Sequence, residues 1–251
     1  MARPGRPRRQ RVLPAQGPPQ PPLTHRDGPN AGSFAAWSAG CPAWRVEERE
    51  YERHERRRGR RHAYVGLDAV RIVLVVVDMV PFFVRENAYT FGIVPNIVRL
   101  ATVLRAAGGT VAWVLPGFVE PAPVDEEFFG PEVAARYARS GSEGLWHEFD
   151  VDAADLVVEK TARSAFFPGR CPLPELLIAR GVDTVVITGT WTNVRCQSSA
   201  RDASTLGYRV VFVADANAAN RDQDHNAALH TVYRTFGDVR ATDEVVDLVK
   251  A

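Results

Sequence analysis

The sequence predicts a doubly wound, three-layer α-β-α fold of the Rossmann-like type with a mostly parallel sheet. Residues 71–77 (RIVLVVV) and 183–189 (DTVVITG) are almost wholly apolar and β-branched, which is typical of strands buried on both faces. Such runs alternate with amphipathic segments. Residues 94–109 (VPNIVRLATVLRAAGG) carry apolar residues at helical spacing and end in two glycines, a usual helix stop.

The remaining elements follow in the same alternation. Further strands are expected at residues 110–115, 155–160 and 208–215, and further helices at 174–181, 194–206 and 224–237, before a short final strand and helix. Residues 116–150 contain four prolines among acidic and aromatic residues. We expect this stretch to be irregular and to cover a site.

The N-terminal residues differ in composition from the rest. Residues 1–45 are rich in Pro, Gly and Arg without periodicity, which predicts disorder, and residues 45–62 alternate charges at helical spacing, which predicts a solvated helix. The chain is therefore divided into a tail, 1–62, and a domain, 63–251. The basic tail could be an arm for nucleic acid, but a solvated tail or a misassigned translation start is favoured, so no nucleic-acid partner is predicted.

Composition excludes several classes of protein. The charge is nearly balanced, with 31 Lys and Arg against 30 Asp and Glu, and the three cysteines are too few for a disulfide framework or a thiolate zinc site. The apolar run 72–84 is interrupted by Asp78 and Pro81, so no membrane span or membrane partner is expected. The N-terminal RRQRVL lacks the apolar core of an export signal. These features predict a cytoplasmic protein.

Three chemically distinct residues follow buried strands. Asp78, Lys160 and Cys196 come at or just beyond strand ends, where ligands bind in sheets of this type. A helix N-terminus and a nearby cation favour a thiolate, so Lys160 could activate Cys196 while Asp78 accepts its proton. Singly, each has a structural alternative: a helix cap, a surface lysine and a small core residue. Their joint occurrence at one sheet edge favours catalysis.

Three motifs extend this pattern: VVVDMVPFFV (75–84), EKTARSAFF (159–167) and VITGTWTNVRCQSSARDA (186–203). With them, residues 68–250 resemble the isochorismatase-like cysteine hydrolases. The resemblance implies Asp78 as general base, Lys160 as the cation that lowers the thiol pKa, and Cys196 as nucleophile. It also implies a non-proline cis peptide at Trp191-Thr192, with backbone N–H groups there and at the nucleophile forming an oxyanion hole.

Two departures from the family pattern matter. The Asp-x-His metal motif of nicotinamidases is missing after the second strand, which reads WVLPGFVE (113–120), so no metal or other cofactor is predicted. Relatives also read T-N-V-C where this chain reads TNVRC, which puts Arg195 in the nucleophile position. Either the loop re-registers so that Cys196 serves, or the protein is a catalytically silent relative; the retained Asp78 and Lys160 favour re-registration.

These features predict a cysteine hydrolase of non-peptide C–N bonds that works through a thioester. The expected pocket residues are Phe82, Phe83, Trp113, Trp191 and Arg195, although the aromatic residues are equally typical of a core. A nucleotide-binding oxidoreductase ranks last, because no glycine-rich fingerprint follows the first strand.

The substrate is inferred mainly from resemblance. The DMVPFF variant and a composition like that of high-GC actinobacteria are similar to members that open the lactam of the cationic antibiotic streptothricin and so confer resistance. Acidic residues in the irregular segment could attract such a substrate, namely Glu120, Asp125, Glu126 and Glu127. Nicotinamide, carbamoyl and ureido compounds are the alternatives. The resemblance also implies a homo-oligomer, either a dimer or a tetramer.

Overall fold

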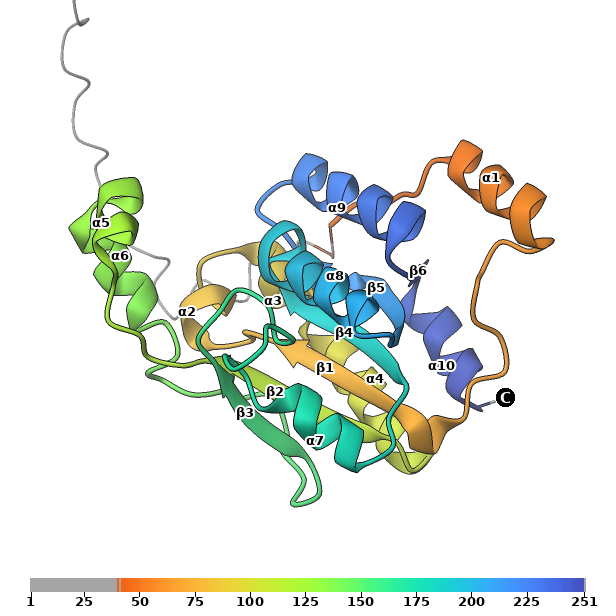
Figure 1. Cartoon of the computed structure of the whole chain (residues 1–251), viewed down its shortest axis with the longest axis horizontal. Helices are drawn as coiled ribbons and strands as arrows, with labels where there is room; N and C mark the ends of the chain where they lie inside the picture. Colours follow the sequence, from red (N-terminus) through yellow and green to blue (C-terminus); the bar gives the residue numbers. More distant parts are fainter. Residues whose placement is uncertain (1–39, 41, 251) are drawn as a thin grey trace, which may run out of the picture.

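A six-stranded sheet forms the centre of the molecule in the computed structural model, which describes residues 40 and 42–250 (Figure 1). The strand order is β3-β2-β1-β4-β5-β6, and all five pairings are parallel. The strands are β1 (Ile72–Val77), β2 (Thr110–Pro116), β3 (Leu156–Lys160), β4 (Thr184–Thr190), β5 (Arg209–Ala218) and β6 (Asp238–Arg240). The predicted three-layer α/β fold is confirmed.

Helices cover both faces of this sheet. One face packs against α4 (Val94–Ala106) and α10 (Thr242–Lys250), and the other against α7 (Leu173–Ala179), α8 (Gln197–Thr205) and α9 (Asp222–Thr235). Two short helices, α2 (Pro81–Val84) and α3 (Ala88–Gly92), follow β1. Each predicted strand and helix of the domain is present within a few residues.

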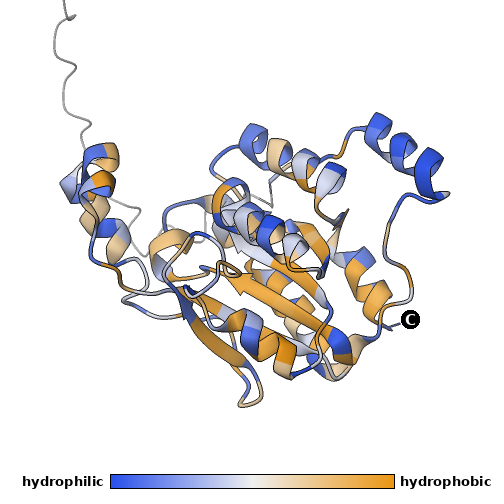
Figure 2. Ribbon diagram, in the orientation of Figure 1, coloured by the Kyte–Doolittle hydropathy of each residue, from blue (hydrophilic) through white to orange (hydrophobic). Residues whose placement is uncertain are grey.

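Successive side chains of β1 enter opposite cores because strand side chains alternate between faces. Val73, Val75 and Val77 lie in the core beneath α7, α8 and α9, whereas Leu74 and Val76 lie in the core beneath α4 and α10. All six β1 residues are buried. Figure 2 shows the strands as a mainly hydrophobic centre. This burial explains why β1 reads as an unbroken apolar run.

The segment predicted to be irregular contains two helices, α5 (Pro123–Phe129) and α6 (Pro131–Ala138). Each begins with proline in its first turn, where the missing N–H costs no hydrogen bond, so prolines taken as signs of a loop are helix starts. Gly130 joins them at a φ of 81°, which favours glycine. The hairpin projects from the body of the molecule (Figure 1).

The charged helix expected in residues 45–62 exists as α1 (Glu48–Arg58), but it is docked rather than solvated. Tyr51 and His54 are buried, the Tyr51 ring meets Tyr233 of α9 at 5.0 Å, and His54 Nε2 lies 3.2 Å from the Tyr233 carbonyl oxygen. The tail predicted for residues 1–45, with Cys41, falls almost wholly outside the described residues. The division at residue 62 stays a prediction.

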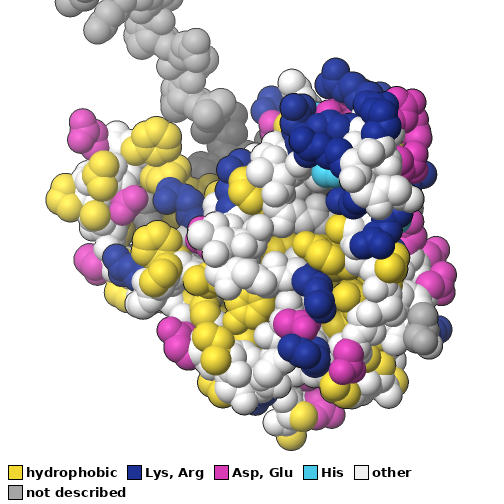
Figure 3. Space-filling view, turned by 45° about the vertical axis from the view of Figure 1, so that its right-hand side comes forward, with side chains coloured by type: hydrophobic (Ala, Val, Ile, Leu, Met, Phe, Trp, Pro, Cys, Tyr) yellow, Lys and Arg dark blue, Asp and Glu magenta, His cyan; other side chains and the backbone are white. Residues whose placement is uncertain are grey.

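A buried carboxylate ties the end of this arm to the edge strand. Asp238 of β6 is fully buried, contacts His62 Nδ1 at 3.1 Å and accepts a hydrogen bond from the Ala63 backbone N–H at 3.1 Å. Figure 3 shows arginine side chains gathered over the α1 side of the molecule.

Within residues 40 and 42–250, no helix combines the length and apolarity that a bilayer crossing requires.

Candidate active site

Asp78 and Lys160 meet at the carboxyl edge of the sheet. Asp78 directly follows β1, and Lys160 ends β3, two strands away in the sheet. Both side chains are buried, and Lys160 Nζ donates to Asp78 Oδ2 at 2.7 Å. Asp78 adopts a φ of 54°, a left-handed conformation that aspartate tolerates better than most residues and that often occurs at functional sites. The predicted proximity of these two residues is therefore present.

Arg195 also contacts this carboxylate. Its Nε lies 2.7 Å from the same Oδ2 atom, whereas Asp78 Oδ1 is buried with no hydrogen-bond partner among the described residues. The Arg195 guanidinium carbon sits 4.4 Å from the centroid of the Phe83 ring and 5.5 Å from that of Trp191. Cation–π contacts of this kind hold the guanidinium plane in place. Arg195, not Cys196, therefore points at Asp78.

Cys196 lies in the hydrophobic core beneath α8. It is fully buried, and its Sγ is 3.9 Å from the carbonyl oxygen of Thr188 in β4. Burial, followed by the negative charge of Asp78, raises the pKa of the thiol far above its usual value, although Lys160 and Arg195 partly oppose this. The expected re-registration is not seen: residues Thr192–Cys196 form a π-helical turn in which Arg195 keeps the site-facing position.

The loop after β4 differs in detail from the prediction. The cis peptide joins Thr190 and Trp191, one bond earlier than expected. The N–H groups of Val194, Arg195 and Cys196 all donate to the Trp191 carbonyl oxygen, at 3.0, 3.0 and 3.2 Å. Because these donors are engaged within the turn, they do not form the expected oxyanion hole at residue 196.

Thr192 anchors this turn to a neighbouring helix. Its hydroxyl lies 2.9 Å from Nδ1 of His225 in α9, and both residues are fully buried. Desolvation lowers the pKa of His225 to about 4, so the ring is neutral near pH 7. A neutral ring leaves one nitrogen able to accept from the hydroxyl. Thr192, predicted to be an oxyanion-loop residue, thus positions the loop.

Lys160 and Arg195 line a cavity of about 580 Å³ in front of the Asp78 cluster. Burial lowers the pKa of Lys160, an effect that the Asp78 carboxylate opposes. The helical hairpin forms much of the opposite wall. Side chains from this wall and from the loop after β3 are Glu120, Asp125, Phe128, Phe129, Ala134, Tyr137, Arg163 and Arg170.

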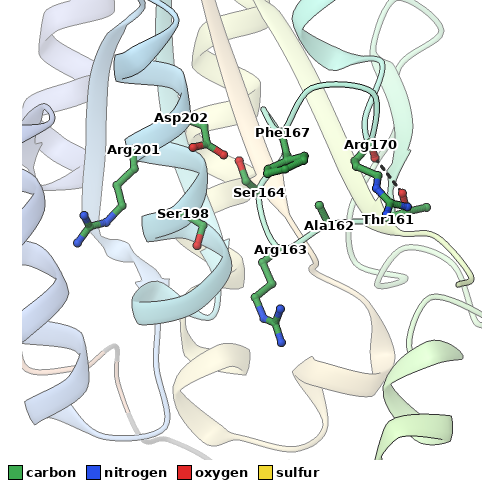
Figure 4. Close-up of a pocket in the computed structure, with 9 residues that line it drawn as sticks. All are labelled: Thr161, Ala162, Arg163, Ser164, Phe167, Arg170, Ser198, Arg201 and Asp202. Carbon is green, nitrogen blue, oxygen red and sulfur yellow. Dashed lines mark hydrogen bonds between the residues drawn. The ribbon is translucent and has the colours of Figure 1, made fainter. Parts of the chain in front are cut away.

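Arg163 and Arg170 were not predicted as site residues, although Arg163 lies within the EKTARSAFF motif. Both come from the loop after β3 and are shared with a second depression of about 400 Å³ against α8 (Figure 4). Figure 4 shows Arg163 projecting from the middle of this loop and Arg170 beside Thr161. The Arg170 carbonyl accepts a 2.8 Å hydrogen bond from the Thr161 N–H, which folds the loop back. Loop residues of this kind carry no periodic signal in sequence.

Several predicted wall residues lie elsewhere. Trp113 is buried in the core, where its Nε1 donates to Asp155 Oδ2 at 2.8 Å. Phe83 lies beneath Arg195, and Phe82 packs on Tyr137 with ring centroids 5.9 Å apart, so neither lines the cavity directly. Trp191 does line it. Among the acidic residues, Glu120 and Asp125 lie on the cavity wall, whereas Glu126 and Glu127 do not.

The fold and this site together define a class of protein with an open α/β sheet. A buried carboxylate and two cations lie at the carboxyl ends of its strands, beside a cavity of small-molecule size. The isochorismatase domain model matches residues 73–244, which include all of the sheet except Ile72. The chain belongs to the isochorismatase family.

Similar proteins cover most of the chain. The uncharacterized isochorismatase family protein YwoC of Bacillus subtilis is 30% identical over 193 residues, 74% of this chain and 98% of its own length. Ureidoacrylate amidohydrolase RutB of Methylobacterium radiotolerans is 30% identical over 69% of this chain and 77% of its own. A cysteine hydrolase structure from Pseudomonas syringae superposes with a TM-score of 0.67 at 27% identity, covering 75% of this chain and 97% of its own. The similar proteins thus include hydrolases, one of them an amidohydrolase by name.

Proposed function

We propose that this protein hydrolyses the C–N bond of a small amide in the cavity, with Asp78 as the base. The observation that carries the proposal is the buried pair of Asp78 and Lys160, 2.7 Å apart, beside a cavity of about 580 Å³. Membership of a family that contains an amidohydrolase 30% identical to this chain gives the reaction class.

The two oxygens of Asp78 are suited to different tasks. Oδ2 is held by Lys160 and Arg195, whereas Oδ1 accepts no hydrogen bond from the described residues and can take a proton. In the proposed reaction, a water oxygen bonds to the amide carbon and loses a proton to Asp78. The C–N bond then breaks, and the nitrogen receives that proton. The products are a carboxylic acid and an amine. The two cations stabilise negative charge on the carbonyl oxygen.

Water replaces the thiol in this scheme for a geometric reason. A thioester route needs the Cys196 sulfur inside the cavity and ionised. Neither Asp78 nor Cys196 lines the cavity itself, but Asp78 contacts two cations that do, whereas the Cys196 sulfur contacts the Thr188 carbonyl oxygen in the core and burial raises the pKa of its thiol. The geometry therefore supports direct hydrolysis better than the covalent route expected from sequence.

A second candidate is a binding protein without turnover, and the ion pair between Arg195 and Asp78 favours it. Lys160 and Arg195 both hold Oδ2 of Asp78, so only Oδ1 is left for proton transfer. The same cavity would then bind a small carbonyl compound and release it unchanged.

The antibiotic substrate is a narrower proposal. Glu120 and Asp125 on the cavity wall support a cationic substrate such as streptothricin, and its hydrolysis would confer resistance. Lys160, Arg163, Arg170 and Arg195 on the same cavity oppose it. A cytoplasmic location and a dimer or tetramer also stay proposals.

The test is amine or ammonia release by the purified full chain from ureido and carbamoyl compounds, nicotinamide and streptothricin. Asp78→Asn is expected to lower the rate by about 100-fold or more, because it removes the base. Cys196→Ala is expected to stay within about 3-fold of the parent rate, the effect of a small core change. Circular dichroism checks that each variant is folded.

Each other result has a definite meaning. Loss of turnover in folded Cys196→Ala would restore the thioester route. Binding of amides without release of amine from any of them would replace hydrolysis by the binding function. An undiminished rate in Asp78→Asn would remove Asp78 as the base.

A further inference from the structure

We infer that Arg195 is the specificity-determining residue of the cavity, and that it selects ligands carrying a carboxylate. This inference deepens the proposed function, since it names the substrate class of the same cavity. It rests on four properties of the site: charge balance, the free side of the guanidinium group, the other charged groups of the cavity, and the engagement of the backbone N–H groups of residues 194–196 within the loop.

The charge balance of the buried cluster is uneven. Lys160 and Arg195 both contact one oxygen of a single carboxylate, and the side chains of Lys160 and Asp78 are 2% and 0% exposed. Two cations and one anion leave a surplus positive charge when all three groups are ionised. A charge removed from water needs a partner, because burial disfavours the charged form of a group. An anionic ligand group would supply that partner.

The guanidinium group has a free side. Its Nε is committed to Asp78, its face is covered by Phe83 and Trp191, and neither terminal nitrogen has an acceptor among the described residues. The Arg195 side chain is 14% exposed and lines the cavity. Guanidinium groups bind carboxylates through paired N–H donors in a fixed fork. Arg195 is thus both accessible and pre-oriented.

Other charged groups add to this preference. Arg163 and Arg170 line the same cavity, which brings its cations to four with Lys160 and Arg195, against Glu120 and Asp125 on its wall. The Asp125 carboxylate is used locally, where it accepts from the Ala122 N–H at 3.1 Å. Glu86 is close enough for Arg195 to lower its pKa, but burial outweighs this and the pKa is raised. Glu86 forms no ion pair with Arg195 within the described chain.

Three backbone donors beside this cluster are engaged within their own turn. The N–H groups of residues 194–196 already donate to the Trp191 carbonyl oxygen, so they are not free for a ligand oxygen. The side chains of Arg195 and Lys160 both contact Asp78 and line the cavity. A carboxylate on Arg195 would neutralise the surplus charge.

The test compares three ligands with the same ring and different charges: benzoate, benzamide and benzylamine. Binding to the full chain is measured by isothermal titration calorimetry at pH 7 and low salt. Benzoate is expected to bind about 10-fold or more tightly than the other two, as one charge-assisted hydrogen bond predicts. Arg195→Gln should abolish the preference for benzoate, and Arg195→Lys should retain part of it. Arg209→Gln, at the far end of β5, is the charge-matched control and should bind as the parent does.

Folding of each variant is checked by its melting temperature, and Arg195→Lys serves as the probe if Arg195→Gln does not fold. Three results would overturn the inference. The first is equal binding of the three ligands by the parent, and the second is a benzoate preference that survives in Arg195→Gln. The third is a benzoate preference in Arg195→Lys that is as large at high salt as that of the parent. The proposed function fails separately. Benzoate selectivity without amide hydrolysis would contradict only the proposed hydrolysis. Amide hydrolysis without benzoate selectivity would contradict only the inference about Arg195.

Discussion

The Nε atom of Arg195 lies 2.7 Å from Oδ2 of Asp78, so a guanidinium group, not the neighbouring thiol, faces this carboxylate. This contact makes the cavity wall cationic beside Asp78, while the neighbouring Cys196 is directed into the core. The chemistry of the site therefore depends on an ion-paired carboxylate. The first two predictions follow from this arrangement.

Replacing Arg195 with cysteine should create a reactive thiol. Arg195→Cys places sulfur at a cavity-lining position beside Asp78 and Lys160, where a cation favours the thiolate. We expect one additional iodoacetamide adduct on residue 195, formed at least about 10-fold faster than any adduct on Cys196. Peptide mass spectrometry measures both rates. An unmodified residue 195 in the folded variant would show that this position does not face the cavity.

Cys196 itself should resist alkylation in the native protein. It is fully buried, and desolvation raises the pKa of its thiol. We expect labelling only after unfolding in guanidinium chloride. Cys171 provides an internal comparison, because it is also buried but keeps 5% of its surface exposed, whereas Cys196 has none exposed. Rapid labelling of Cys196 under native conditions, with loss of activity, would favour the sequence-based thiol mechanism.

His225 should make the fold sensitive to acid. Burial lowers its pKa from 6.5 to about 4, so the unfolded state binds more protons between these values and stability falls as pH drops through this window. The full shift corresponds to about 3 kcal/mol at most. Urea unfolding at pH 7 and pH 4.5 should show a smaller loss of stability in His225→Gln than in the parent. His230→Gln, on the same helix, is the matched control. Equal losses in parent and His225→Gln would contradict the prediction.

His62 should have the opposite pH dependence. Burial lowers its pKa, but the contacts with Asp238 and Glu244 outweigh this and raise it above 6.5; Arg240, Arg58 and Tyr51 also face this cluster. Its stabilising effect is complete below about pH 6.5 and is lost as pH rises through the higher folded-state pKa.

Native-state hydrogen exchange of α1 measures this effect. Opening of the helix should become easier between pH 6 and pH 9 in the parent, and the change should be smaller in His62→Gln. Glu244→Gln removes one of the two carboxylates and should give an intermediate result. Protection of α1 that increases with pH, after correction for intrinsic exchange, would exclude His62 as the titrating group.

Asp155 should be important for stability. Its buried carboxylate accepts from Trp113 Nε1 at 2.8 Å and from Arg105 Nε at 3.1 Å, which joins the turn before β3 to β2 and α4. Asp155→Ala leaves a buried N–H and a partly buried charge unpaired, so we expect a loss of about 3 kcal/mol in the free energy of unfolding. The exposed Asp150→Ala is the control. A loss below about 1 kcal/mol would contradict this assignment.

Much of the fold could be predicted because its signals are local. The buried strands are continuous apolar runs, and α4 has apolar residues at helical spacing. The helices α5 and α6 were missed because each is less than three turns long and begins with proline. The docking of α1 could not be predicted either. Its partner Tyr233 lies far along the chain, and the mixed charges of α1 alone are typical of a solvated helix.

The sequence alone determined that Asp78 and Lys160 would lie close together, since parallel strands end at the same edge of a sheet. It also placed Arg195 and Cys196 next to each other at that edge. Only the tertiary structure decided which of them contacts Asp78, because adjacent helical residues point about 100° apart and the turn between β4 and α8 sets their rotation. That rotation places a guanidinium group in the cavity and a thiol in the core.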